Sequence, residues 1–263
     1  MSAGATFSDL APRVVSGLLM AGVGAAALVT GSFAFDLLLI IAASVMHWEL
    51  ARLANPLSRQ APWFAAVFTA FFAILIFYSQ SSIWMVIYFA LHSFFQAQFF
   101  YALKRASVLT SLAILLAVVL LHWLRSDYGF HTVLWLICVV VLTDIGGYFG
   151  GRLVGGPKLA PRFSPKKTWS GALTGWILSF ALTVVFVSFE WISGPYILLG
   201  LFALFISVTS QVSDICESAL KRAFDAKDSS QLIPGHGGVM DRFDGLTGAT
   251  IACSLCLLVT NIV

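Results

Sequence analysis

Two stretches of this sequence, Asp144–Lys167 and Asp214–Asp244, collect the side chains that could do chemistry. They hold 16 of the 27 charged residues within 55 of the 263 positions, and all four Gly-Gly pairs of the chain fall in them. Lysine and arginine neutralise phosphates, carboxylates hold Mg²⁺, and glycine lets the backbone approach a ligand closely. Together these residue types predict a phosphate-handling site.

The first stretch combines basic residues with a predicted helix start. Five Lys and Arg residues and no acidic residue lie in 152–167. Ser164 is followed by proline, which predicts a helix N-cap with proline at the first helical position. The first helical turn would then hold Lys166, Lys167 and Thr168. Cations there oppose the helix dipole unless an anion lies among them, so the stretch predicts a phosphate-binding turn. The alternative is an ordinary positive-inside loop.

The second stretch predicts a polar stripe on a helix that continues beyond its apolar run. Asp214, the pair Glu217 and Ser218, and the pair Lys221 and Arg222 follow one another at intervals of three or four residues. This helical spacing places them on one face, with a carboxylate at membrane depth and cations further out. Asp144, near the inner end of another apolar run, is a second functional candidate, because charges at that depth are costly. Its alternative is an interfacial or turn-capping aspartate.

The chain then breaks at a Pro-Gly pair and reaches the start of the last apolar run. Gly237 and Gly238 permit close approach of the backbone to a ligand. Asp241 and Asp244 are three residues apart, so both can face one point, while Arg242 points elsewhere. Carboxylates from two helix ends beside a basic loop predict a Mg²⁺ site, because Mg²⁺ takes one or two carboxylates together with waters and substrate phosphates. The alternative is an ion-pair network within the protein.

The composition places these stretches in a membrane protein. The chain is 59% apolar and 10% charged, with a mean hydropathy of +0.93, which excludes a soluble globular enzyme, a disordered chain and a disulfide scaffold. A net charge of +3 is too small for a nucleic-acid binder. Nine runs are long and apolar enough to be membrane-spanning helices. These runs are Val14–Thr30, Phe33–Trp48, Pro62–Tyr78, Ile83–Tyr101, Val108–Leu124, Thr132–Phe149, Ala172–Phe189, Tyr196–Val212 and Leu246–Val263.

The charge distribution predicts the orientation of these helices. With nine spans, 14 of the 15 Lys and Arg residues fall on one side of the membrane, and Arg125 alone falls on the other. Because cytoplasmic loops carry the excess of basic residues, we expect the N-terminus inside and the C-terminus outside. The predicted fold is an all-α, polytopic membrane protein with one domain over 1–263. Its N-terminal helices cover about 1–130 and its catalytic half about 131–263. Asp36, within the second run, stays unassigned.

The polar residues resemble the signature of the phosphatidate cytidylyltransferases, also called CDP-diacylglycerol synthases. The matching positions are Ser218, Lys221, Arg222, Lys227, Asp228, Ser230, Ile233, Pro234, His236, Gly237, Gly238, Asp241, Arg242, Phe243 and Asp244. A second block with the family's character comprises Asp144, Gly151, Arg152, Ser164 to Thr168, and Gly171. The N-terminal third is similar only in hydrophobic outline. Ser213 and Ser170 depart from the residues frequent in the family, so Ser170 is not assigned a catalytic role.

The resemblance implies transfer of the cytidylyl group from CTP to phosphatidic acid in phospholipid biosynthesis. It implies Mg²⁺ on Asp214 and Asp241, a monovalent cation such as K⁺ beside it, and a supporting role for Asp244. Lys221 and Arg222 join these three as catalytic residues. The implied substrate-phosphate-binding residues are Asp144, Ser164, Lys166, Lys167, Thr168, Ser218, His236, Gly237, Gly238 and Arg242. For His236 the alternative is a structural role in the turn. A homodimer among membrane lipids is expected, in a bacterial inner membrane with the site on its cytoplasmic side.

Two other classes of protein fit part of this pattern. A related CTP-dependent membrane enzyme, such as a polyprenol or phytol kinase or an ether-lipid cytidylyltransferase, shares the combination of membrane helices and nucleotide. The kinases are not expected to carry the full signature. An anion transporter also has intramembrane charges and glycine-broken helices, but its two halves should repeat one another. Here polarity is confined to the C-terminal half.

Overall fold

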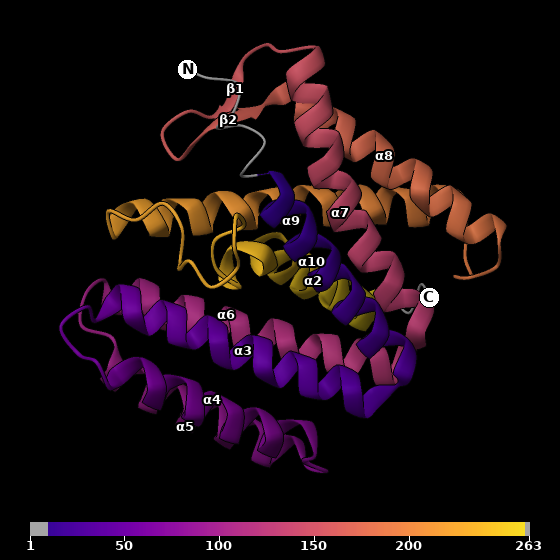
Figure 1. Cartoon of the computed structure of the whole chain (residues 1–263). Coiled ribbons are helices and arrows are strands. Elements are labelled where there is room, and N and C mark those ends of the chain that lie inside the picture. The colour runs from indigo at the N-terminus through magenta and orange to yellow at the C-terminus, as the bar shows by residue number, and fades with distance from the viewer. Residues whose placement is uncertain (1–9, 261–263) are drawn as a thin grey trace. The chain divides into compact units, whose positions relative to one another are not determined.

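The computed structural model describes residues 10–260, and these are mostly helical (Figure 1). The helices are α2 (Leu10–Thr30), α3 (Ser32–Ala54), α4 (Ala61–Phe77), α5 (Ser82–Phe99), α6 (Lys104–Trp123), α7 (Gly129–Leu153), α8 (Trp169–Ser188), α9 (Tyr196–Ala223) and α10 (Met240–Thr260), with a π-helical turn η1 (Leu124–Tyr128) between α6 and α7. Each predicted apolar run corresponds to one of these helices. The last three residues of the final run lie outside the described residues.

Two short strands add a feature that the sequence did not predict. The strands β1 (Lys158–Ala160) and β2 (Ser164–Thr168) pair antiparallel, with Lys158 opposite Thr168 and Ala160 opposite Ser164. They form a hairpin between α7 and α8. The positions expected to start a helix therefore belong to a strand.

Within the described residues, six helical stretches have the length and apolarity needed to cross a membrane. These are Pro12–Thr30, Ser32–Ala54, Lys104–Leu153, Trp169–Ser188, Tyr196–Ala223 and Met240–Val259. Lys104–Leu153 is 50 residues long and contains α6, η1 and α7, whereas α4 is a shorter apolar helix. The chain is thus a helical, multi-pass membrane protein, and the predicted number of nine spans stays a prediction.

The chain divides into two compact units. Unit 1 comprises Met1–His122 and Ala223–Phe243, and unit 2 comprises Trp123–Arg222 and Asp244–Val263. In unit 1, α3 packs against α2 and α4, and α4 packs against α5 (Figure 1). In unit 2, α7 packs against α8, and both contact the hairpin.

Buried polar side chains of unit 1 pair with one another across its helices. Asp36 of α3, which the sequence left unassigned, lies 2.6 Å from Nδ1 of His122 of α6. His47 of α3 lies 3.0 Å from the Ser111 hydroxyl of α6. Polar groups in a bilayer must find partners inside the protein, because lipid offers none. These contacts therefore hold α3 against α6.

The α7–α8 contact corrects the predicted role of two Gly-Gly pairs. They lie inside α7, and Gly146 faces α8 so closely that an added Cβ would be 2.9 Å from the Cα of Gly175. An added Cβ on Gly171 would meet the backbone oxygen of Gly147. Gly146 and Gly150, like Gly171 and Gly175, are spaced four residues apart, which is the small-residue spacing that lets membrane helices pack closely. Gly146 and Gly150 therefore serve the close packing of α7 against α8, which is a role that the predicted phosphate site does not explain.

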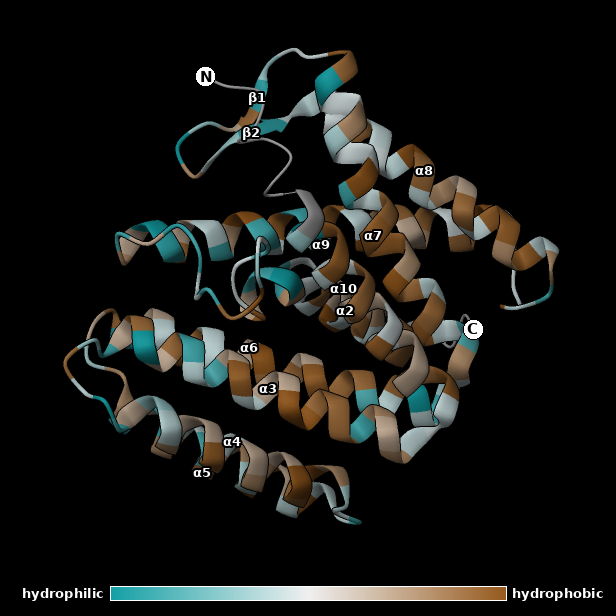
Figure 2. Ribbon diagram, in the orientation of Figure 1, coloured by the Kyte–Doolittle hydropathy of each residue, from teal (hydrophilic) through white to brown (hydrophobic). Residues whose placement is uncertain are grey.

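Unit 2 is polar in two places. Figure 2 shows hydrophobic residues along much of α7 and α8, and hydrophilic residues at the hairpin and at the C-terminal end of α9. The hairpin carries Lys158, Arg162, Lys166 and Lys167, and the end of α9 carries Lys221 and Arg222. The basic residues of unit 2 that these two places carry therefore lie at the hairpin and at the end of a helix.

Candidate functional site

The hairpin between α7 and α8 positions the basic residues of the first stretch. Lys166 and Lys167 lie on β2, and α8 begins at Trp169 with Thr168 as its N-cap. The Thr168 hydroxyl accepts a hydrogen bond of 3.2 Å from the N–H of Gly171. The predicted N-cap at Ser164 is therefore wrong. A proline after it also suits a short strand, because φ near −65° is tolerated there and a two-stranded hairpin does not require every N–H.

A pocket of about 560 Å³ lies beside this hairpin within unit 2. One part of its wall is β2, which contributes Ser164, Lys166, Lys167 and Thr168. The other part is α7, which contributes Asp144, Gly147, Gly151 and Arg152. We call this the basic pocket, because three of its four charged side chains are cationic. The structure thus brings together five of the predicted substrate-phosphate-binding residues, namely Asp144, Ser164, Lys166, Lys167 and Thr168.

Lys167 also connects the hairpin to α9. Its ammonium group forms an ion pair with Oδ2 of Asp214, and both side chains are about a quarter exposed. The Ser218 hydroxyl, one turn further along α9, donates a hydrogen bond of 3.3 Å to Oδ1 of the same carboxylate. A cation from the first stretch therefore meets a carboxylate from the second. Both the phosphate-site prediction and its alternative, an ion-pair network within the protein, allow this contact, so the choice between them stays a prediction.

The predicted continuation of α9 beyond its apolar run is confirmed. The helix runs without interruption to Ala223. Along it, the Lys221 ammonium lies 3.3 Å from Oε1 of Glu217, four residues earlier. Lys221 and Glu217 are buried, whereas Arg222 is exposed. Spacing by one helical turn thus places a carboxylate and its cation on the same face.

Several carboxyl groups of unit 2 lie near one another. The Asp244 carboxyl, in α10, lies near the carboxyl groups of Glu217, Asp214 and Asp144. In the part of the chain that the structure describes, no three Asp, Glu, His or Cys side chains form a ready metal site. Mg²⁺ does not require one, since one or two carboxylates with waters and phosphates suffice.

The rest of the signature folds as a loop in unit 1, between α9 and the start of α10. Asp241 holds this loop: its Oδ2 accepts hydrogen bonds from the Ser229 N–H at 2.9 Å, the Ser229 hydroxyl at 2.9 Å and the Gly238 N–H at 2.7 Å. Gly237 has a φ of +85°, and an added Cβ there would be 2.7 Å from the same oxygen. The signature glycine and aspartate are therefore packed against each other.

Glu49 is a functional candidate that the sequence analysis missed. It lies in α3, has no exposed surface, and its carboxylate faces the signature loop of unit 1. Oε1 accepts from the Ser230 hydroxyl at 2.5 Å and the Val239 N–H at 2.9 Å, and Oε2 accepts from the Ser229 hydroxyl at 3.1 Å and the Met240 N–H at 2.7 Å. The sequence offered only one indication of this role, namely an acidic residue directly after the second apolar run. Local spacing could not reveal the partners of Glu49, because they lie about 180 positions away.

Three more predicted residues lie in this loop. The His236 ring is anchored, since its Nδ1 lies 2.7 Å from the Ser16 hydroxyl of α2. The Gly237 N–H donates to the Ile233 carbonyl at 3.1 Å, and the Gly238 N–H goes to Asp241. All three therefore have partners within unit 1.

The predicted metal ligands fall in different units. Asp241 belongs to unit 1 and Asp214 to unit 2. Arg242 and Asp244 follow Asp241 in the first turns of α10, and the Arg242 side chain is exposed. The assignment of Mg²⁺ to this pair stays a prediction.

Known proteins with similar sequences are phosphatidate cytidylyltransferases. The relative from Brucella suis biovar 1 (strain 1330) is 50% identical over 131 residues, which cover 49% of this chain and 48% of the relative. The Bacillus subtilis (strain 168) relative is 43% identical over 45% of this chain and 44% of its own. The relative from Haemophilus influenzae (strain ATCC 51907 / DSM 11121 / KW20 / Rd) is 41% identical over 49% and 46%. The chain thus spans about half the length of the curated relatives it matches.

A sequence model of a whole family covers much more of the chain. Residues 11–260 match a family sequence model that is described as "Cytidylyltransferase family". That range includes α3 with Glu49, the hairpin, α9 and the signature loop. It therefore joins the N-terminal helices to the two charged stretches in one family pattern. On this match, the chain belongs to the cytidylyltransferase family.

Proposed function

We propose that this protein transfers the cytidylyl group of CTP to phosphatidic acid, giving CDP-diacylglycerol and pyrophosphate. The observation that carries the proposal is the basic pocket of unit 2, in a chain that belongs to the cytidylyltransferase family. Both substrates carry phosphates, which need cations in fixed positions. Arg152, Lys166 and Lys167 supply them, and the relatives' names supply the reaction class.

The reaction we propose is an in-line displacement at phosphorus. A phosphatidate oxygen attacks the α-phosphorus of CTP and forms the new P–O bond. The bond from that phosphorus to the bridging oxygen of the β-phosphate breaks, and pyrophosphate leaves with the electron pair. Positioning and charge neutralisation dominate such transfers. Lys166 and Lys167 would neutralise the triphosphate, and Lys221 and Arg222 the leaving pyrophosphate.

Mg²⁺ fits the chemistry of the Asp214 carboxylate, which pairs with Lys167 of the basic pocket. Asp214 would hold it with Asp241, Asp244 would support these ligands, and a monovalent cation such as K⁺ would lie beside them. Carboxylate oxygens are the protein ligands that Mg²⁺ prefers, and Lys167 beside Asp214 attracts the phosphates that complete its shell. When bound, the ion neutralises charge on the transferring phosphate. The hydrogen bond from the Ser218 hydroxyl would orient the Asp214 carboxylate for the ion.

The proposal extends to placement in the membrane. Nine spans, a cytoplasmic N-terminus and a site on the cytoplasmic side of a bacterial inner membrane all follow from the distribution of basic residues. The resemblance to the family supports a homodimer, which light scattering of the purified protein in detergent would measure. A single membrane domain covering the chain completes the proposal.

Isotope transfer tests the reaction directly. Purified protein in detergent is incubated with phosphatidic acid, Mg²⁺ and CTP labelled at the α-phosphate. Label in the lipid fraction is the expected result. Label that enters the lipid only from γ-labelled CTP would mean a kinase, and no lipid label from either nucleotide would contradict both. Omitting Mg²⁺ and then K⁺ tests the cofactors separately.

A further inference from the structure

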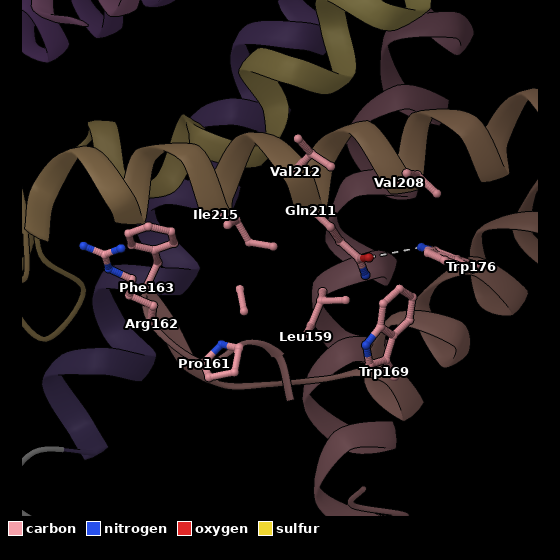
Figure 3. Close-up of a pocket in the computed structure, with 11 residues that line it drawn as sticks. Leu159, Pro161, Arg162, Phe163, Trp169, Trp176, Val208, Gln211, Val212 and Ile215 are labelled. Carbon is pink, nitrogen blue, oxygen red and sulfur yellow. Dashed lines mark hydrogen bonds between the residues drawn. The ribbon is translucent and has the colours of Figure 1, made fainter. Parts of the chain in front are cut away.

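A second pocket of unit 2, about 470 Å³ in volume, is almost entirely apolar. It is lined by Val208, Val212 and Ile215 from α9, by Leu159 and Phe163 from the hairpin, and by Trp169 from the start of α8, and Figure 3 draws these residues around the region between α9 and the hairpin. We call it the apolar pocket. Its volume is within the range of roughly 300–1,000 Å³ that small-molecule sites occupy.

The apolar pocket adjoins the basic pocket. Leu159 and Gln211 line both of them. The hairpin lines both spaces: β2 contributes Lys166 and Lys167 to the basic pocket, while β1 and the turn contribute mostly apolar side chains to the other, with Arg162 as its one charged lining residue. Gln211 is held in place on the shared wall, since its Oε1 accepts a 3.1 Å hydrogen bond from Nε1 of Trp176 (Figure 3). A cationic space and an apolar space therefore share one wall.

We propose that the apolar pocket binds an acyl chain of the lipid whose phosphate occupies the basic pocket. This inference rests on the proposed function and adds a subsite to it. The complementarity is that of an amphiphile: an anionic head beside an apolar chain matches cations beside an apolar cavity. The pocket differs from an ordinary lipid-facing helix surface because the hairpin, which lies outside the helices, closes one side of it.

Another apolar pocket of unit 2 provides a comparison. It measures about 520 Å³, lies against α9 and α10, and is lined by residues such as Phe205, Leu255 and Val259. It shares no lining residue with the basic pocket. Bulk membrane lipid should treat the two apolar pockets alike, whereas a substrate chain should use only the one that adjoins the cations.

Matched substitutions test the proposal. Val208→Trp fills the apolar pocket, and Val259→Trp places the same side chain in the comparison pocket. The KM of each purified variant is measured for dioleoyl and for dihexanoyl phosphatidic acid in mixed micelles. We expect Val208→Trp to raise the dioleoyl KM about 10-fold relative to the dihexanoyl KM, and Val259→Trp to leave that ratio within about twofold. Equal effects on both chain lengths, or no effect, would overturn the acyl-chain site.

A labelling experiment on the unsubstituted protein covers the case in which a variant does not fold. Phosphatidic acid with a photoreactive diazirine at the end of one chain is cross-linked to the protein, and the modified peptides are identified by mass spectrometry. We expect the apolar pocket to be labelled. Excess phosphatidic acid should suppress this labelling, whereas excess phosphatidylcholine should not. Equal labelling of the comparison pocket would identify bulk lipid and reject the site. If the unsubstituted protein formed no CDP-lipid from either chain length while still showing this labelling, the proposed reaction would fail and the lipid site would stand.

Discussion

At the scale of single residues, the contact between Lys167 and Asp214 joins the two charged stretches. Without the Lys167 cation, the repulsion between the substrate phosphates should be less well neutralised, and Asp214 should lose its contact with the hairpin. We therefore expect Lys167→Gln to lower CDP-lipid formation about 100-fold, the scale of losing one charge-stabilising group in an active site. The measurement is the rate of lipid labelling from α-labelled CTP.

Lys158 provides the matched control for this substitution. It lies on β1 of the same hairpin and does not line the basic pocket. Lys158→Gln removes the same charge from the same element, so the rate should stay within about twofold. Equal losses in the two variants would show that the net charge of the hairpin matters and the Lys167–Asp214 contact does not.

Glu49 leads to a second prediction about a single side chain. Each of its oxygens accepts a backbone N–H, from Val239 and from Met240. In Glu49→Gln the amide nitrogen must replace one oxygen, so one N–H would face another donor, which costs about 1–3 kcal/mol. We expect faster proteolysis of the loop at 224–239 and a lower rate of CDP-lipid formation.

Asp36→Asn is the control for Glu49→Gln. It also neutralises a buried carboxylate of α3, but its partner is His122 of α6. Its effect should therefore appear in thermal unfolding and leave proteolysis of the loop unchanged. If the two variants changed loop proteolysis equally, the Glu49 contacts would not be what holds the loop.

At the scale of elements, the close approach of α7 and α8 decides where the hairpin lies. Gly146→Ala adds a methyl group 2.9 Å from the Cα of Gly175 on α8. Backbone cannot move aside as a flexible side chain can, so we expect destabilisation of about 1–3 kcal/mol, which overpacking typically costs. Thermal unfolding in detergent measures it.

Gly147→Ala tests whether the destabilisation depends on the added methyl group facing α8. The two glycines are neighbours on α7, but an added Cβ on Gly147 meets nothing within 4 Å. Alanine also favours the helix by roughly 1 kcal/mol over glycine in soluble hosts. Gly147→Ala should therefore be neutral or stabilising, and a loss like that of Gly146→Ala would contradict close packing as the cause.

At the scale of the whole molecule, the distribution of basic residues predicts the number of spans. Ser126 lies in the segment where Arg125 is the one basic residue, whereas Ser58 lies in a segment predicted to be cytoplasmic. In a chain without its native cysteines, Ser126→Cys should react with a membrane-impermeable maleimide on intact bacterial cells. Ser58→Cys should react only after permeabilisation. Reaction of both, or of neither, from outside would contradict the nine-span arrangement.

Much of the fold followed from the sequence. Apolar runs about 20 residues long located the helices of the described residues, because the bilayer requires that length and that composition. Residue spacing also predicted the polar stripe on α9, since positions three and four apart share a helix face. The hairpin was missed because its Ser-Pro start suits a helix and a short strand equally. The pairing with β1 decided in favour of the strand, and no local sequence pattern indicates that pairing.

The sequence by itself determined that this is a helical membrane protein and that its charged residues collect in two stretches of the C-terminal half. Composition and local spacing suffice for both, because they depend on neighbours along the chain. Only the tertiary structure decided that Glu49 serves the signature loop, that Gly146 packs against α8, and that an apolar pocket adjoins the basic one. Each of these depends on contacts between residues far apart in the chain. Such contacts produce no pattern of residue spacing along the chain, since they form only when the helices pack.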